Sequence, residues 1–236
     1  MTATGLWGDL ADLVLPVDCA GCGASARPLR LGFCVDCMAV LAALDPRSVR
    51  PDPVPPGLPP CTALGGYDGA LREALLSYKE RGRHRLARPL GRLLADVVVR
   101  AVGPEPVLLV PVPATGRAAR QRHGDHLRRL TSYAAGRLRA AGHAAVVVHP
   151  LRALPRADST ALDRTARAAA AAHAFQLRPG RIPALRRLVP GRSVVVLDDI
   201  VTTGATLASV ANLLRAAGVP VATAAVLAAT ELRHAP

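Results

Sequence analysis

The chain has 236 residues, of which 50% are hydrophobic and only 20% are charged, which excludes a globally disordered protein and allows one large domain with a small appendage. The formal net charge of +13 favours an anionic partner such as nucleic acid, a phosphate-rich metabolite or a membrane surface. Aromatic residues make up only 3% of the chain, too few for a platform on which single-stranded bases would stack.

The sequence contains no uncharged stretch long enough to span a membrane. The longest apolar candidate, residues 216–230, is interrupted by Gly218 and Pro220. The N-terminus has no basic segment followed by an apolar one, so we expect no signal peptide. These features predict a cytoplasmic protein without membrane insertion, in a compartment where thiols stay reduced.

Residues 1–44 carry four of the five cysteines, as two Cys-x-x-Cys pairs separated by eleven residues. Two such pairs can place four thiolates tetrahedrally around one Zn²⁺, and the metal would supply folding energy to a region with little core of its own. Disulfides or unrelated buried thiols are the alternatives, and a reducing compartment argues against disulfides. We predict a closed, non-catalytic zinc knuckle with the ligands Cys19, Cys22, Cys34 and Cys37. We assign no role to Cys61.

Residues 45–60, DPRSVRPDPVPPGLPP, are rich in proline and cannot form a regular helix, so we interpret them as a semi-rigid linker. From residue 61 to residue 236, helical and short strand patterns alternate, which is typical of an α/β domain with a parallel sheet flanked by helices. The strands expected there are 61–68 at an edge, 107–111, 144–149, 193–199 and 221–229. The helices expected there are 70–79, 86–102, 126–141, 162–172 and 205–217.

Residues 194–207, VVVLDDIVTTGATL, join a buried strand to a Thr/Gly-rich turn and the start of a helix. The loop and helix N-terminus that follow a central parallel strand form a natural ligand crevice, and the helix dipole there favours an anion. A glycine in the turn removes the Cβ that would block close approach, and threonine hydroxyls add donors. The predicted phosphate cradle consists of Thr202, Thr203, Gly204, Ala205 and Thr206.

Two adjacent carboxylates, Asp198 and Asp199, directly precede this cradle. They would repel a phosphate unless they face another part of the same ligand, and a sugar with vicinal hydroxyls beside its phosphate meets that condition. Carboxylates there can also lie near Mg²⁺ or stabilise positive charge on a sugar ring. The alternative is a strand that ends in solvent-exposed aspartates, followed by an ordinary capped helix.

A second candidate turn follows the strand at 107–111. Proline fixes the turn, and Arg117, Arg120 and Arg122 come next, suited to charge-assisted contacts with phosphate oxygens. For Arg120 and Arg122, an arginine-rich solvated helix start is an equal alternative.

The segment 194–207 is similar to the phosphoribosyl-pyrophosphate (PRPP) motif of type I phosphoribosyltransferases, and the chain as a whole resembles the ComF family of that superfamily. Four stretches carry the resemblance in this order: CAGCG…CVDC, YKERGRHRLARPLG, PVPATGRAARQR and DD-x-x-TTGAT. The resemblance implies that Asp198 and Asp199 bind the ribose hydroxyls of Mg²⁺-PRPP and that residues 202–206 hold its 5′-phosphate. It also implies a pyrophosphate loop formed by Val112, Pro113, Ala114, Thr115, Gly116 and Arg117.

The same resemblance implies a mobile loop at residues 152–167 that closes over the site. The sequence departs from the family at residues 122–126, where RHGDH replaces an Arg-Gly-aromatic-Asn-Gln run. His123 and His126 could form a metal pair, or could be solvated residues at the start of a helix. Lys79, the only lysine of the chain, could add positive potential to the site or simply end a helix.

Two functions follow from these features. The first is transfer of a phosphoribosyl group from PRPP to an unknown acceptor, with catalysis by positioning and electrostatics. The second is a non-catalytic module that binds nucleotide or single-stranded DNA. The ComF resemblance implies a role in DNA uptake, alongside competence helicase-type proteins.

Overall fold

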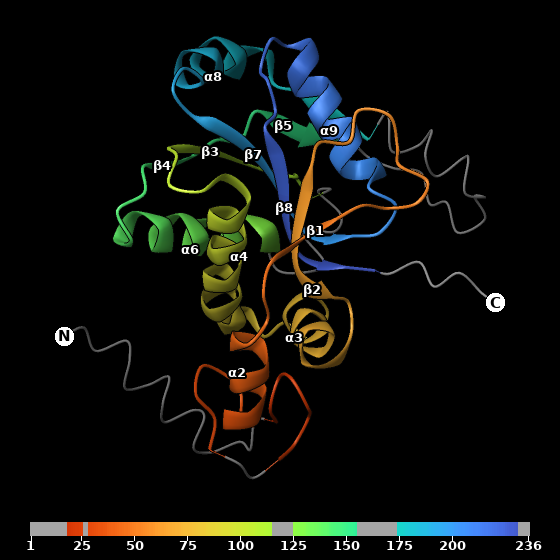
Figure 1. The fold of residues 1–236 in the computed structure, drawn as a ribbon, viewed down its shortest axis with the longest axis vertical. Coiled ribbons are helices and arrows are strands. Elements are labelled where there is room, and N and C mark those ends of the chain that lie inside the picture. The colour runs from red at the N-terminus through yellow and green to blue at the C-terminus, as the bar shows by residue number, and fades with distance from the viewer. Residues whose placement is uncertain (1–17, 26–27, 115–124, 155–173, 231–236) are drawn as a thin grey trace.

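A six-stranded sheet forms the centre of the computed structural model, which describes residues 18–25, 28–114, 125–154 and 174–230 (Figure 1). The β1–β2 pair is antiparallel, and all the other neighbouring strands run parallel. The predicted α/β fold with a mostly parallel sheet is therefore confirmed. In spatial order the strands are β1 (Arg47–Val49), β2 (Cys61–Gly66), β8 (Thr223–Ala229), β7 (Ser193–Val201), β3 (Val107–Pro111) and β4 (Ala145–Val147).

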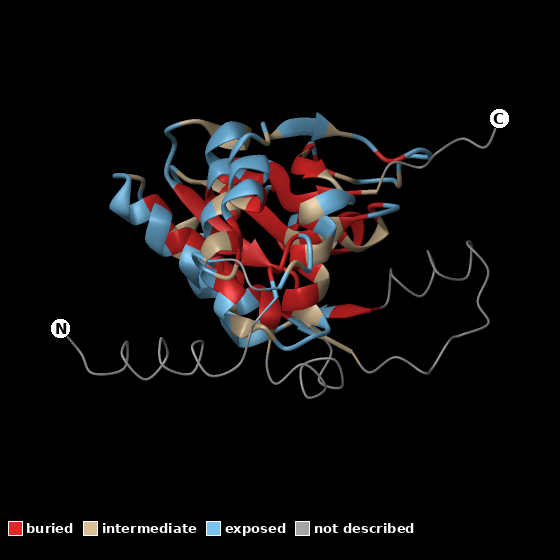
Figure 2. Cartoon of the chain, turned by 90° about the horizontal axis from the view of Figure 1, so that it is seen from below, coloured by how far each residue is buried: buried red, intermediate tan, exposed pale blue. Residues whose placement is uncertain are grey.

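The three central strands β8, β7 and β3 are almost entirely buried, as expected of parallel strands that are covered on both faces. In Figure 1, α4 and α6 lie on one side of these strands and α9 lies on the other. Figure 2 shows the buried residues gathered between the layers and the exposed ones outside. The main helices are α3 (Gly69–Lys79), α4 (Ala87–Val102), α6 (His126–Ala140), α8 (Ile182–Leu188) and α9 (Ala205–Ala216).

The cysteine-rich region, which contains α2 (Val35–Ala42), packs directly against α3. The Ser77 hydroxyl donates to the carbonyl of Ala20 at 3.4 Å, and the Arg83 guanidinium donates to the carbonyl of Asp18 at 2.7 Å. Buried cysteines and Phe33 of this region belong to the same hydrophobic core as the sheet. We call residues 18–44 the cysteine knuckle; it shares one core with the α/β domain.

The proline-rich segment was expected to be only a linker, but it supplies the outermost strand of the sheet. β1 pairs with β2 in the register Arg47↔Ala63, so the prediction that residues 61–68 form an edge strand is wrong. The rest of the segment lies along α9, where Asn212 donates to the carbonyl of Pro56 at 3.2 Å and Arg215 donates to the carbonyl of Gly57 at 2.5 Å. A three-residue strand next to prolines leaves no periodic signal in the sequence, which is why it was missed.

A small second sheet was also not foreseen. It pairs β5 (Leu151–Ala153) with β6 (Phe175–Leu177) in antiparallel fashion. The expected helix 162–172 lies outside the described residues. No helix among the residues that the structure describes is long and apolar enough to cross a membrane.

Candidate functional site at the carboxyl edge of the sheet

The turn after β7 and the first residues of α9 enclose a small hollow of about 30 Å³. All five residues of the predicted phosphate cradle line it, and Asp198 lines it as well. Gly204 lies just before α9 in the left-handed conformation, with φ of +73°. The structure thus brings the cradle and one of the two carboxylates to a single place, at the amino end of a helix.

The proline-rich segment forms the backing of this turn. A Cβ atom added to Gly204 would lie 3.2 Å from side-chain carbons of Leu58 and Pro51. Glycine at this position therefore allows both the positive φ angle and the close packing of Leu58 and Pro51 against the turn. The sequence alone did not show that residues 51–58 would support the turn.

The two carboxylates point to opposite faces of β7, because successive side chains of a strand alternate. Asp198 is partly buried and faces the hollow. Asp199 is only 6% exposed and faces α3 and α6. Its Oδ2 atom lies 3.0 Å from Lys79 Nζ and 2.6 Å from His126 Nε2. The alternative in which both aspartates end in solvent does not match these positions.

His126 is a site residue that the sequence analysis missed. It was expected to be a metal ligand or a solvated residue, but its imidazole is buried and bonded to Asp199. The Tyr78 hydroxyl donates to the carbonyl of His126 at 2.6 Å. Burial of His126 could have been inferred from helical spacing, because His126, Leu130 and Ala134 form one buried face of α6. His123 lies outside the described residues.

Lys79 has both roles that the sequence allowed, the end of a helix and a source of positive charge. It is the last residue of α3, and it carries a positive charge into the site by pairing with Asp199.

The environment separates the pKa values of the two carboxyls. Burial and the neighbouring Asp199 carboxylate raise the pKa of Asp198 to about 8. Burial also opposes ionisation of Asp199, but the hydrogen bond from His126 and the charge of Lys79 outweigh it and lower the pKa of Asp199 to about 2.

Replacing Asp198 by asparagine will raise the thermal stability of the chain, by an amount that grows between about pH 4 and pH 8. The folded-state pKa of this carboxyl lies above its unfolded value, so its contribution to stability is lost as the pH rises towards 8. Asparagine does not titrate, and its side-chain oxygen can still accept the Asp199 N–H that Asp198 accepts at 2.9 Å. Calorimetric melting curves near pH 5 and pH 8.5 test this expectation, and an equal gain at both pH values would contradict it.

The predicted pyrophosphate loop is described only in its first half. Val112, Pro113 and Ala114 follow β3, and the Val112 N–H donates to the carbonyl of Leu197 at 2.9 Å, so the loop begins beside the end of β7. Its remaining residues, Thr115, Gly116 and Arg117, lie outside the described residues, as do Arg120 and Arg122.

The expected mobile loop at 152–167 begins inside a strand. Arg152 and Ala153 belong to β5, and the Arg152 guanidinium donates to the Gln176 side chain at 2.6 Å. Residues 155–167 of that loop lie outside the described residues.

The four knuckle cysteines form a compact cluster. Their Sγ atoms all lie within 4.8 Å of one another, and those of Cys22 and Cys34 are 3.9 Å apart. A tetrahedral site with Zn–S bonds of about 2.3 Å places its sulfurs about 3.8 Å apart, so the cluster has the size that zinc requires.

The surroundings of Cys19 also suit a metal ligand. Burial opposes ionisation of Cys19, but N–H groups of Cys34 and Gly21 that point at its sulfur lower the pKa to about 6. None of the five cysteines, all of which the structure describes, forms a disulfide. The cluster could therefore hold zinc.

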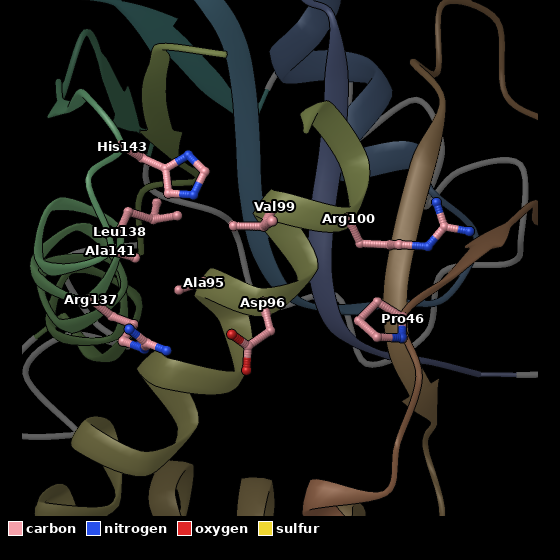
Figure 3. A pocket seen from close by; sticks show the side chains of 9 residues that line it. All are labelled: Pro46, Ala95, Asp96, Val99, Arg100, Arg137, Leu138, Ala141 and His143. Atoms are coloured by element: carbon pink, nitrogen blue, oxygen red, sulfur yellow. The ribbon is translucent and has the colours of Figure 1, made fainter. Parts of the chain in front are cut away.

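A larger groove of about 380 Å³ lies between α4 and α6 (Figure 3). Its floor is apolar, with Ala95, Val99 and Leu138, and Arg100 and Arg137 lie at its sides. It contains neither of the carboxylates nor any residue of the cradle. This groove is larger than the hollow at the end of β7, but the polar groups that could bind one ligand together lie at that hollow.

Comparison with known proteins supports the site at the end of β7. The family model of the phosphoribosyl transferase domain matches residues 136–235, which include β7, both carboxylates, the cradle, α9 and β8. No curated protein matches the chain. The match supports the type I phosphoribosyltransferase superfamily for this part of the sequence. Residues 136–235, less than half of the chain, are therefore similar to a phosphoribosyl transferase domain.

Proposed function

We propose that the protein is a ComF-type phosphoribosyltransferase that binds Mg²⁺-PRPP at the carboxyl edge of the sheet. The observation that carries this proposal is the single hollow lined by Asp198 and by residues 202–206, inside the region matched by the domain model. A carboxylate and an anion-binding turn in one hollow suit a ligand that has both hydroxyl groups and a phosphate.

In this proposal, backbone N–H groups and threonine hydroxyls of the turn hold the 5′-phosphate at the amino end of α9. Asp198 and Asp199 accept hydrogen bonds from the ribose hydroxyls, and residues 112–117 contact the pyrophosphate. Mg²⁺, bound with PRPP, neutralises charge on the pyrophosphate. The Asp199 carboxylate also stabilises positive charge on the ribose ring in the transition state.

The reaction breaks the bond between C1′ and the pyrophosphate oxygen and forms a bond from C1′ to the acceptor, which loses a proton. The site supplies alignment and a fixed electrostatic environment. The cysteine knuckle holds a structural Zn²⁺ through Cys19, Cys22, Cys34 and Cys37, a fit that the spacing of the four sulfurs supports.

The net charge of +13 favours a second candidate function. In it, the protein is a cytoplasmic module of the competence machinery that binds nucleotide or single-stranded DNA without chemistry and works with helicase-type proteins in DNA uptake. Binding driven by phosphate contacts would weaken steeply with salt, and a flat salt response would contradict this alternative.

Calorimetric titration of Mg²⁺-PRPP tests the first proposal. The wild type should bind, and the double variant Asp198→Asn/Asp199→Asn should lose more than about tenfold in affinity, because the ribose hydroxyls lose the ionised acceptor that Asp199 supplies. Asp96→Asn, in the groove between α4 and α6, is the matched control and should bind as the wild type does.

The possible results separate the candidate functions. Failure of the wild type to bind would refute PRPP as the ligand. Unchanged binding by the double variant would place the ligand elsewhere, and weaker binding by Asp96→Asn would point to the groove between α4 and α6. DNA binding that survives in the double variant would show that nucleic acid uses another surface.

A further inference from the structure

We propose that Lys79 and His126 are positioning residues that fix Asp199 for the ribose, a role that rests on the proposed PRPP site. The two adjacent carboxyl groups then differ in how they are held. Asp198 borders the hollow of the phosphate turn, whereas Asp199 is held on the opposite face of β7 by two donors from two different helices.

The first observation is that both donors reach the same oxygen. Lys79 Nζ and His126 Nε2 lie 3.0 Å and 2.6 Å from Oδ2 of Asp199. Neither donor contacts Oδ1, which in this proposal is the oxygen that accepts from a ligand hydroxyl. Two fixed donors on Oδ2 also restrict rotation of the carboxylate, so that its orientation is set before the ligand binds.

The second observation is burial. The side chain of Asp199 is 8% exposed, and those of Lys79 and His126 are 18% and 10% exposed. A buried carboxylate is costly unless it is paired and hydrogen-bonded, and removing one partner from such a cluster leaves uncompensated charge. Lys79 and His126 therefore stabilise the negative charge of Asp199 in a buried position that water does not hydrate.

The third observation is that the donors are themselves held in place. Lys79 ends α3, and the two residues before it anchor that turn on either side. Ser77 donates to the Ala20 carbonyl in the cysteine knuckle, and Tyr78 donates to the carbonyl of His126 at the start of α6. Helices α3 and α6 thus meet β7 at Asp199, and Ser77 ties α3 to the knuckle.

The test compares His126→Leu, His126→Gln and Lys79→Met in titrations with Mg²⁺-PRPP. His126→Leu and Lys79→Met should each weaken binding by about tenfold or more, since each removes a charge-assisted hydrogen bond from Asp199. Glutamine can donate one amide hydrogen to Oδ2, so His126→Gln should recover most of the affinity. His143→Leu, at the groove between α4 and α6, is the matched histidine control and should bind as the wild type does.

The only lysine of the chain gives an independent readout. In protein labelled with ¹⁵N-lysine, one Nζ signal reports Lys79 alone. That signal should shift in Asp199→Asn without any ligand, and it should shift again when Mg²⁺-PRPP is added to the wild type. A lysine without this contact would give the same signal in Asp199→Asn as in the wild type.

Each outcome decides the proposal. Wild-type affinity in His126→Leu and Lys79→Met would overturn the positioning role and leave the PRPP site intact. Equal loss in His126→Gln and His126→Leu would also overturn it, because a restored donor should restore binding. If the wild type does not bind PRPP, the proposed function and this role both fail, and the lysine signal then identifies the cluster as purely structural.

Discussion

Replacing Cys34 by alanine will release the zinc proposed for the knuckle and lower the melting temperature of the whole chain by about 10 °C or more. A structural zinc stabilises an isolated knuckle by about 10 kcal/mol, and one kcal/mol corresponds to about 2–4 °C for a chain of this size. Cys34 is buried, and its backbone N–H also donates to Cys19 Sγ at 3.2 Å. Elemental analysis and calorimetry on the same sample measure both effects.

The loss will reach the sheet because the knuckle shares its core with the α/β domain. A Cβ atom on Gly21 would lie 3.3 Å from the Cβ atom of Ala70 in α3, and one on Gly32 would lie 2.8 Å from Leu86 in the turn before α4. Packing this close cannot be kept when the knuckle unfolds. We therefore expect one cooperative transition at a lower temperature, in place of an early melting step that leaves the sheet unchanged.

Cys61→Ala is the matched control for this prediction. Cys61 is also a buried cysteine, but it lies on β2 outside the cluster. Its burial, and to a lesser degree the nearby Asp198 carboxyl, raise the pKa of its thiol to about 12. Its replacement should cost only about 1–2 kcal/mol and leave the metal content unchanged. If Cys34→Ala has the metal content and the melting temperature of Cys61→Ala, Cys34 is not a ligand of a stabilising metal.

The central part of the fold could be predicted because its signals are local. The strand at 107–111 has the bounds that its apolar run indicates, and α9 begins at Ala205 directly after the turn glycine, as the sequence indicates. The strands β1, β5 and β6 have three residues each, and they exist only through pairing with a partner strand. β4 is equally short but lies in the apolar run at 144–149, whereas β1, β5 and β6 lie in no such run and could not be recognised without the tertiary structure.

The candidate site also has one part that could be predicted from the sequence and one part that could not. The composition of the turn at 202–206 predicts an anion cradle, because glycine, threonine and a following helix act over neighbouring residues. The partners of Asp199 could not be predicted, because His126 is 73 positions away and Lys79 lies on another helix. Strand alternation alone would have shown that Asp198 and Asp199 face opposite sides of β7.

Replacing Gly204 by alanine will destabilise the chain by about 1–3 kcal/mol, because alanine in the left-handed region is strained. The new methyl group would also lie 3.2 Å from Leu58 and Pro51, so these side chains or the turn must shift. A shift of the turn misplaces the donors for the phosphate, and we expect PRPP affinity to fall by about tenfold or more. Chemical denaturation and calorimetric titration measure the two effects.

Replacing Gly136 by alanine is a control in which we expect the stability to change in the opposite direction. Gly136 lies on the exposed side of α6, and a Cβ atom there would meet no atom within 4 Å. Alanine has the higher helix propensity, so Gly136→Ala should stabilise the chain by about 0.5–1 kcal/mol and leave PRPP binding unchanged. If Gly204→Ala behaves like Gly136→Ala in both measurements, the turn after β7 does not depend on its left-handed glycine and is not a preformed phosphate cradle.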